Sequence, residues 1–497
     1  MGIVTTVDYL SFLKNSGGIA LCHGIFDVLH EGHLNYFEEA KKLSNTVVVS
    51  ITSDRFVNKG PGRPHFDANT RARMIAALQC VDFVIINDEP RATNVIKALQ
   101  PKYYVKGQDY KNRSDDLTGG ILEEEEAIKS VGGEIVFTNR PTHSSSNLIN
   151  KFFNSFSEEQ NKTIAKINSL GGINTIRDIF SKIEKYYVTV IGEPIVDTYV
   201  FCEPEGISSK SPTVSARYIN EENYAGGSLA IANHLSDFVR GVSLYAPHGN
   251  ELYFQELKNN QINRRVMYND TNLYSYITPR KTRYIDKDTK QRIFELTNIT
   301  PKMWCNNDPR ILLHNIKNSV VDSQVTLLCD FGHGLFEGSF LAGCSDLSGF
   351  IALNCQTNSS NFGFNPYKKH TNFNYLSIDL KEARVAFHDK HSDSKKLFEK
   401  IDARNVSVSM TLGPSGALYR HLSSSCTSPA FADKIVDTIG AGDAYYAITS
   451  LMVKANAPFE IVPFVGNIFA GLKTKIIGNK HSVTKAQLFK SIEAILK

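Results

Sequence analysis

The stretch GIALCHGIFDVLHEGHL, residues 18–34, decides how the first part of the chain folds. Its apolar run is broken at Gly24, and a helical pattern follows from about Gly32 to Leu43. Glycine lets backbone amides approach a ligand closely, and the start of a helix presents free N–H groups and a positive dipole end. His30 and His33 are three residues apart at this start, so both imidazoles can face the same phosphate groups. The stretch predicts a strand, a phosphate-binding turn and a helix.

Apolar runs and helical patterns alternate from here to residue 138. We expect strands at 46–51, 81–86, 102–107 and 133–138, and helices at 69–78, 92–100 and 122–132. This alternation predicts a parallel sheet with helices on both faces. The acidic run Glu123–Glu126 is expected to be a solvated face of its helix.

The turn GIFDVLHEGH and the pieces after it resemble the nucleotidyltransferase family of cytidylyl- and adenylyltransferases. The matching pieces are ITSDRFVNKGPGRP (51–64), RARMIAALQCVDFVI (71–85), YYVKGQDY (103–110) and HSSSNLIN (143–150). The resemblance implies that His30 and His33 grip the triphosphate and stabilise the transition state, and that Asp27 shapes the turn. It also implies nucleotide or phosphate binding by Gly24, Phe26, Lys59, Arg63, Arg73, Lys106, Ser144, Ser145 and Ser146.

A second motif, DTIGAGD at 437–443, lies near the other end of the chain. Gly-Ala-Gly at a helix start clusters backbone N–H groups into an anion hole. Asp443, just inside that start, can take a proton from a substrate hydroxyl. A second alternation of strands and helices runs from YYVTVIGE (186–193) to VSVSMTLG (406–413), while 198–222 and 275–297 indicate an added small sheet.

This motif resembles the ribokinase-like sugar kinases of the phosphofructokinase-B type. The resemblance extends to VTVIGEPIVDTYV (188–200), YAGGSLAIANHL (224–235), DFGHGLF (330–336) and TLGPSGAL (411–418). It implies that Asp443 is the catalytic base and that the small sheet is a lid, which often forms a dimer contact. It further implies an anion hole at Gly440, Ala441 and Gly442, a nucleotide side at Gly413 and Gly416, and a sugar site at Asp197, Gly226, Gly227 and Asn233.

The second half departs from its family in three places. Asp379 stands where the family's N-x-x-E has Asn, with Glu382 as the candidate metal residue. The triplet 354–356 is Asn-Cys-Gln where an acidic D-P-K is usual, and His333 replaces the usual Lys. These changes leave an alternative open, in which the C-terminal domain is an altered module that binds sugar phosphate or forms a dimer, and only the N-terminal transferase is active.

Composition excludes several other classes. Lys+Arg 55 against Asp+Glu 51 gives a net charge of +4, too small to predict nucleic acid or a membrane as partner. No apolar run is long enough to span a bilayer, and the N-terminus lacks the pattern of a signal peptide. The eight cysteines show no metal spacing, which predicts buried thiols in a reducing cytoplasm.

The expected fold class is therefore α/β, with two doubly wound parallel-sheet domains. We expect a Rossmann-like nucleotidyltransferase at 1–150, a helical connector at 151–185 and a ribokinase-like domain with a small β lid at 186–497. The two halves together resemble the bifunctional heptose kinase/adenylyltransferases of lipopolysaccharide synthesis, with the domain order reversed. That resemblance implies transfer from CTP or ATP to a sugar or polyol phosphate, coupled to a sugar kinase, with Mg²⁺ as cofactor and a homodimer formed through the lid.

Overall fold

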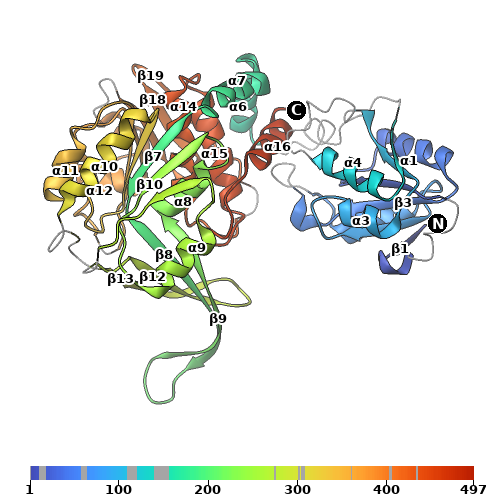
Figure 1. Cartoon of the computed structure of the whole chain (residues 1–497), viewed down its shortest axis with the longest axis horizontal. Coiled ribbons are helices and arrows are strands. Elements are labelled where there is room, and N and C mark those ends of the chain that lie inside the picture. Colours follow the sequence, from blue (N-terminus) through green and yellow to red (C-terminus); the bar gives the residue numbers. More distant parts are fainter. Residues whose placement is uncertain are drawn as a thin grey trace. The chain divides into compact units, whose positions relative to one another are not determined.

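The computed structural model describes residues 2–10, 18–57, 64–108, 120–138, 156–273, 276–299, 303, 308–359, 361–401, 406–432 and 435–497. They fall into two compact units, which are Met1–Glu158 with Phe489–Lys497, and Glu159–Leu488 (Figure 1). Within these described ranges no helix is both long and apolar enough to cross a membrane.

The described part of the first unit contains one sheet of six parallel strands with helices between them. The helices are α1 (Glu31–Leu43), α2 (Ala68–Ala76), α3 (Thr93–Leu99) and α4 (Gly120–Ser130). The strands are β1 (Ile3–Thr5), β2 (Ala20–Gly24), β3 (Val47–Thr52), β4 (Phe83–Asn87), β5 (Tyr103–Lys106) and β6 (Glu134–Phe137).

The strand order of this sheet, β1-β4-β3-β2-β5-β6, places the turn after Gly24 at a switch point. The chain runs outward from β2 through β3 to β4 and then returns to β5 on the other side of β2. Crossovers that leave neighbouring strands in opposite directions open a crevice at the carboxyl ends of those strands, and α/β proteins bind ligands there. Apolar side chains from both faces of the sheet form the core with the helices, and include Cys22, Val49, Phe37 and Ile75 on one face and Leu21, Val48, Ile96 and Ile128 on the other.

Two details of the first unit differ from the sequence-based expectation. Strand β1 was not expected, because it is a three-residue edge strand whose Ile3 and Val4 are 51% and 42% exposed and so lack an apolar pattern. The acidic run is not a fully solvated face, since Glu124 and Glu125 are buried.

The second unit is built on a larger, mostly parallel sheet in the order β11-β10-β7-β14-β15-β16-β17-β18-β19. Strands β18 and β19 are antiparallel additions at one edge. The strands are β7 (Tyr187–Gly192), β10 (Gly241–Tyr245), β11 (Val266–Asn269), β14 (Val325–Asp330), β15 (Ile351–Cys355), β16 (Tyr375–Asp379), β17 (Ser407–Thr411), β18 (Ala417–His421) and β19 (Ser424–Ser428).

Helices cover both faces of this sheet (Figure 1). Four of them, α10 (Pro309–Asp322), α11 (Gly338–Cys344), α12 (Leu380–Phe387) and α13 (Ser394–Glu399), share one apolar core with the strands. Helices α8 (Ser228–Leu235) and α14 (Ala441–Lys454) contact each other and the sheet, and α15 (Ile461–Lys473) packs on α14. The remaining helices of this unit are α6 (Glu158–Ser169), α7 (Gly172–Ile183) and α9 (Leu252–Gln261), and the limit between the two units falls within α16 (Lys485–Leu496).

A separate small sheet forms from the two segments in which the sequence indicates added β structure. It has the order β13-β12-β8-β9 and consists of β8 (Pro194–Ile207), β9 (Val214–Gly227), β12 (Arg280–Asp286) and β13 (Arg292–Asn298). The hairpin of β8 and β9 extends away from the larger sheet of its unit (Figure 1). The two α/β sheets confirm the predicted fold class, and the role of the small sheet as a lid stays a prediction.

The segment 151–185, expected to be a connector, contains α6 and α7. Helix α7 buries Ile176, Ile179 and Phe180, and Gln160 Nε2 of α6 donates a hydrogen bond to the carbonyl of Ala430, at 2.7 Å. The helices therefore pack as part of the second unit, and the domain limits at 150 and 185 stay a prediction.

Candidate active sites

The turn after β2 leaves little space beside Gly24. Phe26 adopts a positive φ of 50°, and its ring folds back over Gly24. A Cβ at position 24 would lie 2.8 Å from Cζ of that ring. Asp27 is buried, and its Oδ1 accepts hydrogen bonds from the backbone N–H groups of His65 and Phe66, at 2.7 and 3.1 Å.

The turn brings His30 and His33 together at the start of α1. Their rings stack with centroids 3.9 Å apart, and the ring of Phe26 meets His33 edge-on at 5.2 Å. His30 is the N-cap residue, and its Nδ1 accepts the backbone N–H of Gly32 at 3.1 Å. In the neutral ring this bond places the proton on Nε2, which makes Nε2 a donor suited to a phosphate oxygen. Two imidazoles and a helix N-terminus thus meet at the switch point of the sheet.

Arg71 ties this turn to the neighbouring strand. Its guanidinium is fully buried, and Nη1 donates to the carbonyl of Ile25 at 2.6 Å, while Nη2 donates to the carbonyl of Thr52 and to Asp54 Oδ1. Its role in the structure is therefore to hold the turn. Arg73, predicted to bind phosphate, is exposed in the last turn of α2.

Lys106, predicted to bind phosphate, has a partner within the protein. Its Nζ lies 2.8 Å from Oε2 of Glu124, and both side chains are less than a tenth exposed. Although burial opposes ionisation, the charge of Lys106 holds the pKa of Glu124 below its usual value. His23 lies on the neighbouring strand β2. Burial, and to a smaller extent the positive charge of Lys106, lower the pKa of its imidazole to about 4. The structure therefore gives Lys106 a positioning role at the carboxyl end of β5. The predicted residues Lys59, Arg63, Ser144, Ser145 and Ser146 lie outside the described residues.

The second unit contains a cavity of about 260 Å³ at the carboxyl ends of its parallel strands. Several predicted residues line it, and the other lining residues come from the ends of β14 to β17, from the small sheet and from the loop before α14. The predicted ones are Asp197, Gly227, Glu382, Gly440, Gly442 and Asp443. Sequence reasoning missed Lys281 and Arg283 as lining residues, because nothing in the alternating pattern of β12 shows which side chains face a ligand.

Asp443 lies in the first turn of α14 and is buried beside the cavity. Burial raises the pKa of its carboxyl from 3.8 to about 6, and the hydrogen bond from Gln356 opposes this rise. A carboxyl whose pKa lies near neutrality can act as a general base at the start of a helix. Gly440, the N-cap residue of α14, has a φ of 75°, and a Cβ there would lie 2.8 Å from Asn479 Oδ1.

Asp437 and Lys473 support the loop before α14. Asp437 accepts hydrogen bonds from the hydroxyl of Tyr199 and the backbone N–H of Gly478, at 2.7 and 2.8 Å. Lys473 is fully buried and donates to the carbonyl oxygens of Ile439 and Gly478. Burial lowers the pKa of the Lys473 amine to about 8, and the nearby carboxylates oppose that change.

Asp197 of β8 faces the cavity together with two cations of β12. The Arg283 guanidinium contacts the Asp197 carboxylate, and Lys281 lines the cavity beside them. Gly226 allows this placement, because a Cβ there would lie 2.3 Å from Asp197 Oδ2. Gly227, with a φ of 59°, is the N-cap residue of α8.

The predicted residues of the second unit that do not line the cavity are Gly226, Ala441, Asn233, Gly413 and Gly416. Asn233 donates to the carbonyl of Gln261 at 2.8 Å and accepts the N–H of Asn263 at 2.9 Å, so its amide joins α8 to the turn after α9. Gly413 and Gly416 form the turn between β17 and β18 with positive φ angles, and a Cβ at Gly416 would lie 2.1 Å from the carbonyl oxygen of Ser428. The structure thus gives Asn233 and Gly416 positions that serve packing.

Asp379 and Glu382 form a capping box at the start of α12, on the wall of the cavity. Glu382 Oε2 accepts the N–H of Asp379 at 2.7 Å, and Oε1 accepts the N–H of Thr357 at 3.2 Å. Burial raises the pKa of Glu382 well above its usual value, and the charge of Asp379 adds to this rise. Replacement of Asn by Asp in this motif is therefore accommodated as a helix cap.

His333, at the position of the usual Lys, does not supply a positive charge. Its ring is buried, and within the described residues neither ring nitrogen has a hydrogen-bond partner. Burial, and then the nearby Lys281, lower the pKa of His333 to about 3, so the imidazole is neutral. The loop is held instead by Glu193, whose carboxyl accepts backbone N–H groups from Phe331, His333 and Leu335.

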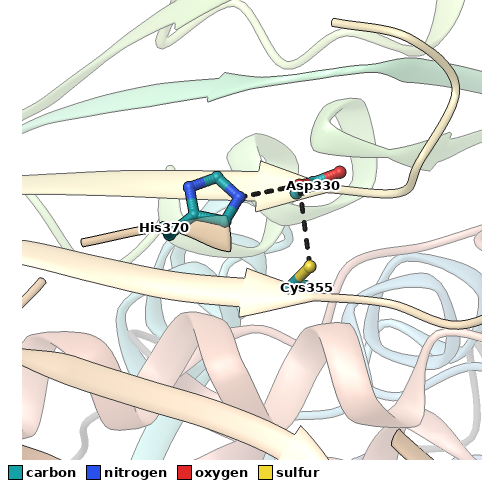
Figure 2. Close-up of side chains that lie close together, drawn as sticks. All are labelled: Asp330, Cys355 and His370. Carbon is teal, nitrogen blue, oxygen red and sulfur yellow. Dashed lines mark hydrogen bonds and ion pairs between the residues drawn. The ribbon is translucent and has the colours of Figure 1, made fainter. Parts of the chain in front are cut away.

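Asp330, Cys355 and His370 form a buried cluster under this loop, with their polar atoms within 4.8 Å of one another (Figure 2). His370 Nε2 and Lys369 Nζ each lie 2.7 Å from Asp330 Oδ2. Although burial opposes ionisation, the bond from His370 and the charge of Lys369 hold the pKa of Asp330 below its usual value. Burial raises the pKa of the Cys355 thiol well above 9. A metal ion bound here would have to displace the Lys369 ammonium from Asp330 and the proton from the Cys355 thiol. The cluster is therefore a structural network.

Comparison with known proteins identifies two domains along the chain. Residues 21–151 match the family model described as cytidylyltransferase-like, and residues 357–484 match that of the pfkB family carbohydrate kinases. The chain joins a cytidylyltransferase-like domain to a pfkB-type kinase domain. The first domain precedes the second along the chain.

Curated relatives match the N-terminal region. The bifunctional protein HldE of Campylobacter fetus is 38% identical over 152 residues, which is 30% of this chain and 31% of the relative. HldE of Methylobacillus flagellatus is 38% identical over 136 residues, 27% of this chain and 26% of the relative. These alignments span less than a third of each relative's length.

Solved structures support the fold of the second unit. Phosphofructokinase-2 from Escherichia coli, in complex with substrates and products, aligns over 63% of this chain and 100% of its own, with 14% identity and a TM-score of 0.50. The same enzyme in complex with potassium aligns over 63% and 99%, with 13% identity and a TM-score of 0.50. At this identity the likeness concerns the fold alone.

Proposed function

We propose that this protein is a bifunctional enzyme that phosphorylates a sugar and activates a sugar or polyol phosphate as a nucleoside diphosphate derivative. The first unit would transfer a nucleotidyl group from CTP or ATP and release pyrophosphate. The second would transfer the γ-phosphoryl group of ATP to a hydroxyl. The observation that carries the proposal is the placement of a buried carboxyl, Asp443, at a helix start beside a ligand-sized cavity. In the first unit of the same chain, His30 and His33 stack at the start of another helix.

In the proposed transferase reaction the acceptor is already a phosphate, so its oxygen needs no base. The phosphate oxygen attacks the α-phosphorus, and the bond to pyrophosphate breaks. Negative charge on the non-bridging oxygens and on the leaving group must be stabilised in the transition state. The Nε2 donor of His30, the ring of His33 and the N-terminus of α1 supply that stabilisation.

In the proposed kinase reaction Asp443 takes the proton of the acceptor hydroxyl as its oxygen attacks the γ-phosphorus. The backbone N–H groups of the turn at Gly440 and Gly442 face the transferred group, since this turn lines the cavity and begins α14. Lys281 favours an acceptor that carries negative charge, such as a sugar phosphate, because it adds positive charge to the cavity wall.

Mg²⁺ is the cofactor that we propose for both reactions. In the second unit, Glu382 would hold the ion together with nucleotide phosphates, because it is a buried carboxyl on the cavity wall beside the charge of Asp379. Bound Mg²⁺ neutralises charge on the phosphates.

The test incubates the protein with each nucleoside triphosphate and Mg²⁺ against a panel of sugars, sugar phosphates and polyol phosphates. Pyrophosphate and nucleoside diphosphate are quantified separately. We expect pyrophosphate with a phosphorylated acceptor and CTP or ATP, and ADP with a sugar-type acceptor and ATP. Absence of both products across the panel would contradict the proposal.

A second candidate function is favoured by the neutral His333 and by Asn354 and Gln356. In this alternative the second unit binds sugar phosphate or forms a dimer without turnover. Binding of a sugar phosphate by calorimetry, with no ADP formed from ATP, would favour it over the kinase.

We also propose a homodimer formed through the lid, within the cytoplasm. The lid strands expose several large apolar side chains, which include Ile207 at 74%, Val214 at 56% and Leu296 at 54%. The seven cysteines among the described residues are free thiols, as a reducing compartment maintains. Light scattering of the wild type and of Leu296→Glu tests the dimer, and a wild-type monomer at micromolar concentration would contradict it.

A further inference from the structure

Gln356 makes a direct contact with the proposed catalytic base. It follows β15, at the position where the sugar-kinase pattern has Lys, and its Nε2 donates to Asp443 Oδ1 at 2.5 Å. The same nitrogen donates to Asn354 Oδ1 at 3.0 Å, and Asn354 Nδ2 donates to the carbonyl of Ser377 at 2.8 Å. All four residues line the cavity.

The direction of this chain of hydrogen bonds is fixed. A backbone carbonyl can only accept, so Asn354 turns its Nδ2 toward Ser377 and its Oδ1 toward Gln356. Gln356 must then present its NH₂ group to both Asn354 and Asp443. Its backbone is held as well, since its N–H donates to the carbonyl of Asp330 at 2.8 Å and its carbonyl accepts the amide of Asn365 at 3.1 Å.

We propose that Gln356 is the positioning residue of the phosphoryl-transfer site, where it holds Asp443 through Oδ1 so that Oδ2 receives the proton of the acceptor hydroxyl. This inference rests on the proposed kinase function. In the step itself, the hydroxyl proton moves to Oδ2, the hydroxyl oxygen bonds to the γ-phosphorus of ATP, and the bond between that phosphorus and the β,γ-bridging oxygen breaks to release ADP.

The charges around Asp443 make the contribution of Gln356 measurable. The groups that influence or face the carboxyl are Gln356, Asp197 of β8, Lys281 of β12, Cys329 of β14, Glu382 of α12 and Lys473 of α15. Burial raises the pKa of Asp443, and a hydrogen bond to the charged form lowers it. Removal of the amide donor therefore raises the pKa, whereas an ammonium in its place lowers it.

The test compares full-length wild type, Gln356→Met and Gln356→Lys. ATP-dependent ADP formation is followed from pH 5 to 9 with the sugar or sugar phosphate of the panel that the wild type uses best. In Gln356→Met the side chain has nearly the same length but no donor, so we expect the acid limb of kcat/KM to move up by about one pH unit, with kcat at pH 6.5 roughly threefold lower. The KM of the acceptor should change little. Gln356→Lys should move the same limb to lower pH.

Gln324→Met is the matched control, because Gln324 accepts the N–H of Tyr187 at the amino end of β7, the opposite edge of the sheet. It should leave the pH profile unchanged. A purely structural role of Gln356 would lower activity in Gln356→Met and Gln356→Lys alike, without opposite shifts of the acid limb. An active wild type whose acid limb stays in place in both variants contradicts this inference alone. A wild type that forms no ADP with any acceptor contradicts the kinase proposal, and the inference falls with it.

Discussion

Replacement of Asp443 by Asn should abolish phosphoryl transfer and, at the same time, stabilise the second unit. The carboxyl is 8% exposed, and burial raises its pKa from 3.8 to about 6. Asn keeps the shape and can still accept the bond from Gln356, but it carries no charge and cannot take a proton. If Asp443 is a positioned general base, ADP formation should fall by roughly 10²–10⁴-fold.

The stability effect follows from the same pKa. A carboxyl whose folded-state pKa is raised costs stability when it ionises, so the penalty is absent below the unfolded pKa and complete above the folded pKa. The difference between 3.8 and about 6 is about 2.2 pKa units, and one unit corresponds to about 1.36 kcal/mol. Asp443→Asn should therefore raise the free energy of unfolding by about 3 kcal/mol at pH 8 and by about half of that at pH 5.

The assay is urea unfolding of the full-length wild type and variant at pH 5 and pH 8, followed by circular dichroism and tryptophan fluorescence. Kinase activity is measured on the same preparations. If Asp443→Asn is inactive and more stable at pH 8, the buried carboxylate serves catalysis at a cost in stability. A variant that is less stable at pH 8, by the same amount as at pH 5, would refute the reasoning, because the carboxylate would then be stabilising the fold.

Four other single changes test separate parts of the structure. His30→Ala and His33→Ala should each lower kcat for pyrophosphate release by on the order of 10²-fold while the thermal unfolding temperature changes little, and near-normal release would refute the phosphate-binding role. Lys106→Met leaves Glu124 buried without its partner and should cost roughly 3–5 kcal/mol in urea unfolding, which the double variant Lys106→Met/Glu124→Leu should largely recover. Gly226→Ala should raise the KM of the kinase acceptor by roughly tenfold, because the new Cβ displaces the Asp197 carboxylate. An unchanged KM would show that Asp197 is not part of the sugar site.

Both sheets could be predicted because buried parallel strands read as continuous apolar runs. Val47–Thr52 and Val325–Asp330 are buried throughout, and each is followed by a turn or a helix that the sequence marks. Edge strand β1 could not be predicted, because its side chains are largely exposed and no periodicity arises.

The site was only partly predictable, because a motif names residues but not their partners. The sequence shows Lys106 as a free cation, whereas the fold pairs it with Glu124 from a helix more than a dozen residues away. Likewise, Asn233 lies in a glycine-rich segment that reaches the cavity, yet its own amide points to the turn after α9. Gln356 carried a signal, since it departs from the family pattern, but its contact with Asp443 depends on how strand β15 and helix α14 meet.

Two independent active sites are tested by following pyrophosphate and ADP separately in the wild type, His30→Ala/His33→Ala and Asp443→Asn, with the same nucleotides, acceptors and Mg²⁺. We expect a double dissociation. The histidine variant should lose pyrophosphate release and keep ADP formation, and Asp443→Asn should lose ADP formation and keep pyrophosphate release from a ready-made sugar phosphate. Loss of both products in either variant, with the fold intact, or retention of both in either one, would contradict two independent active sites on one chain.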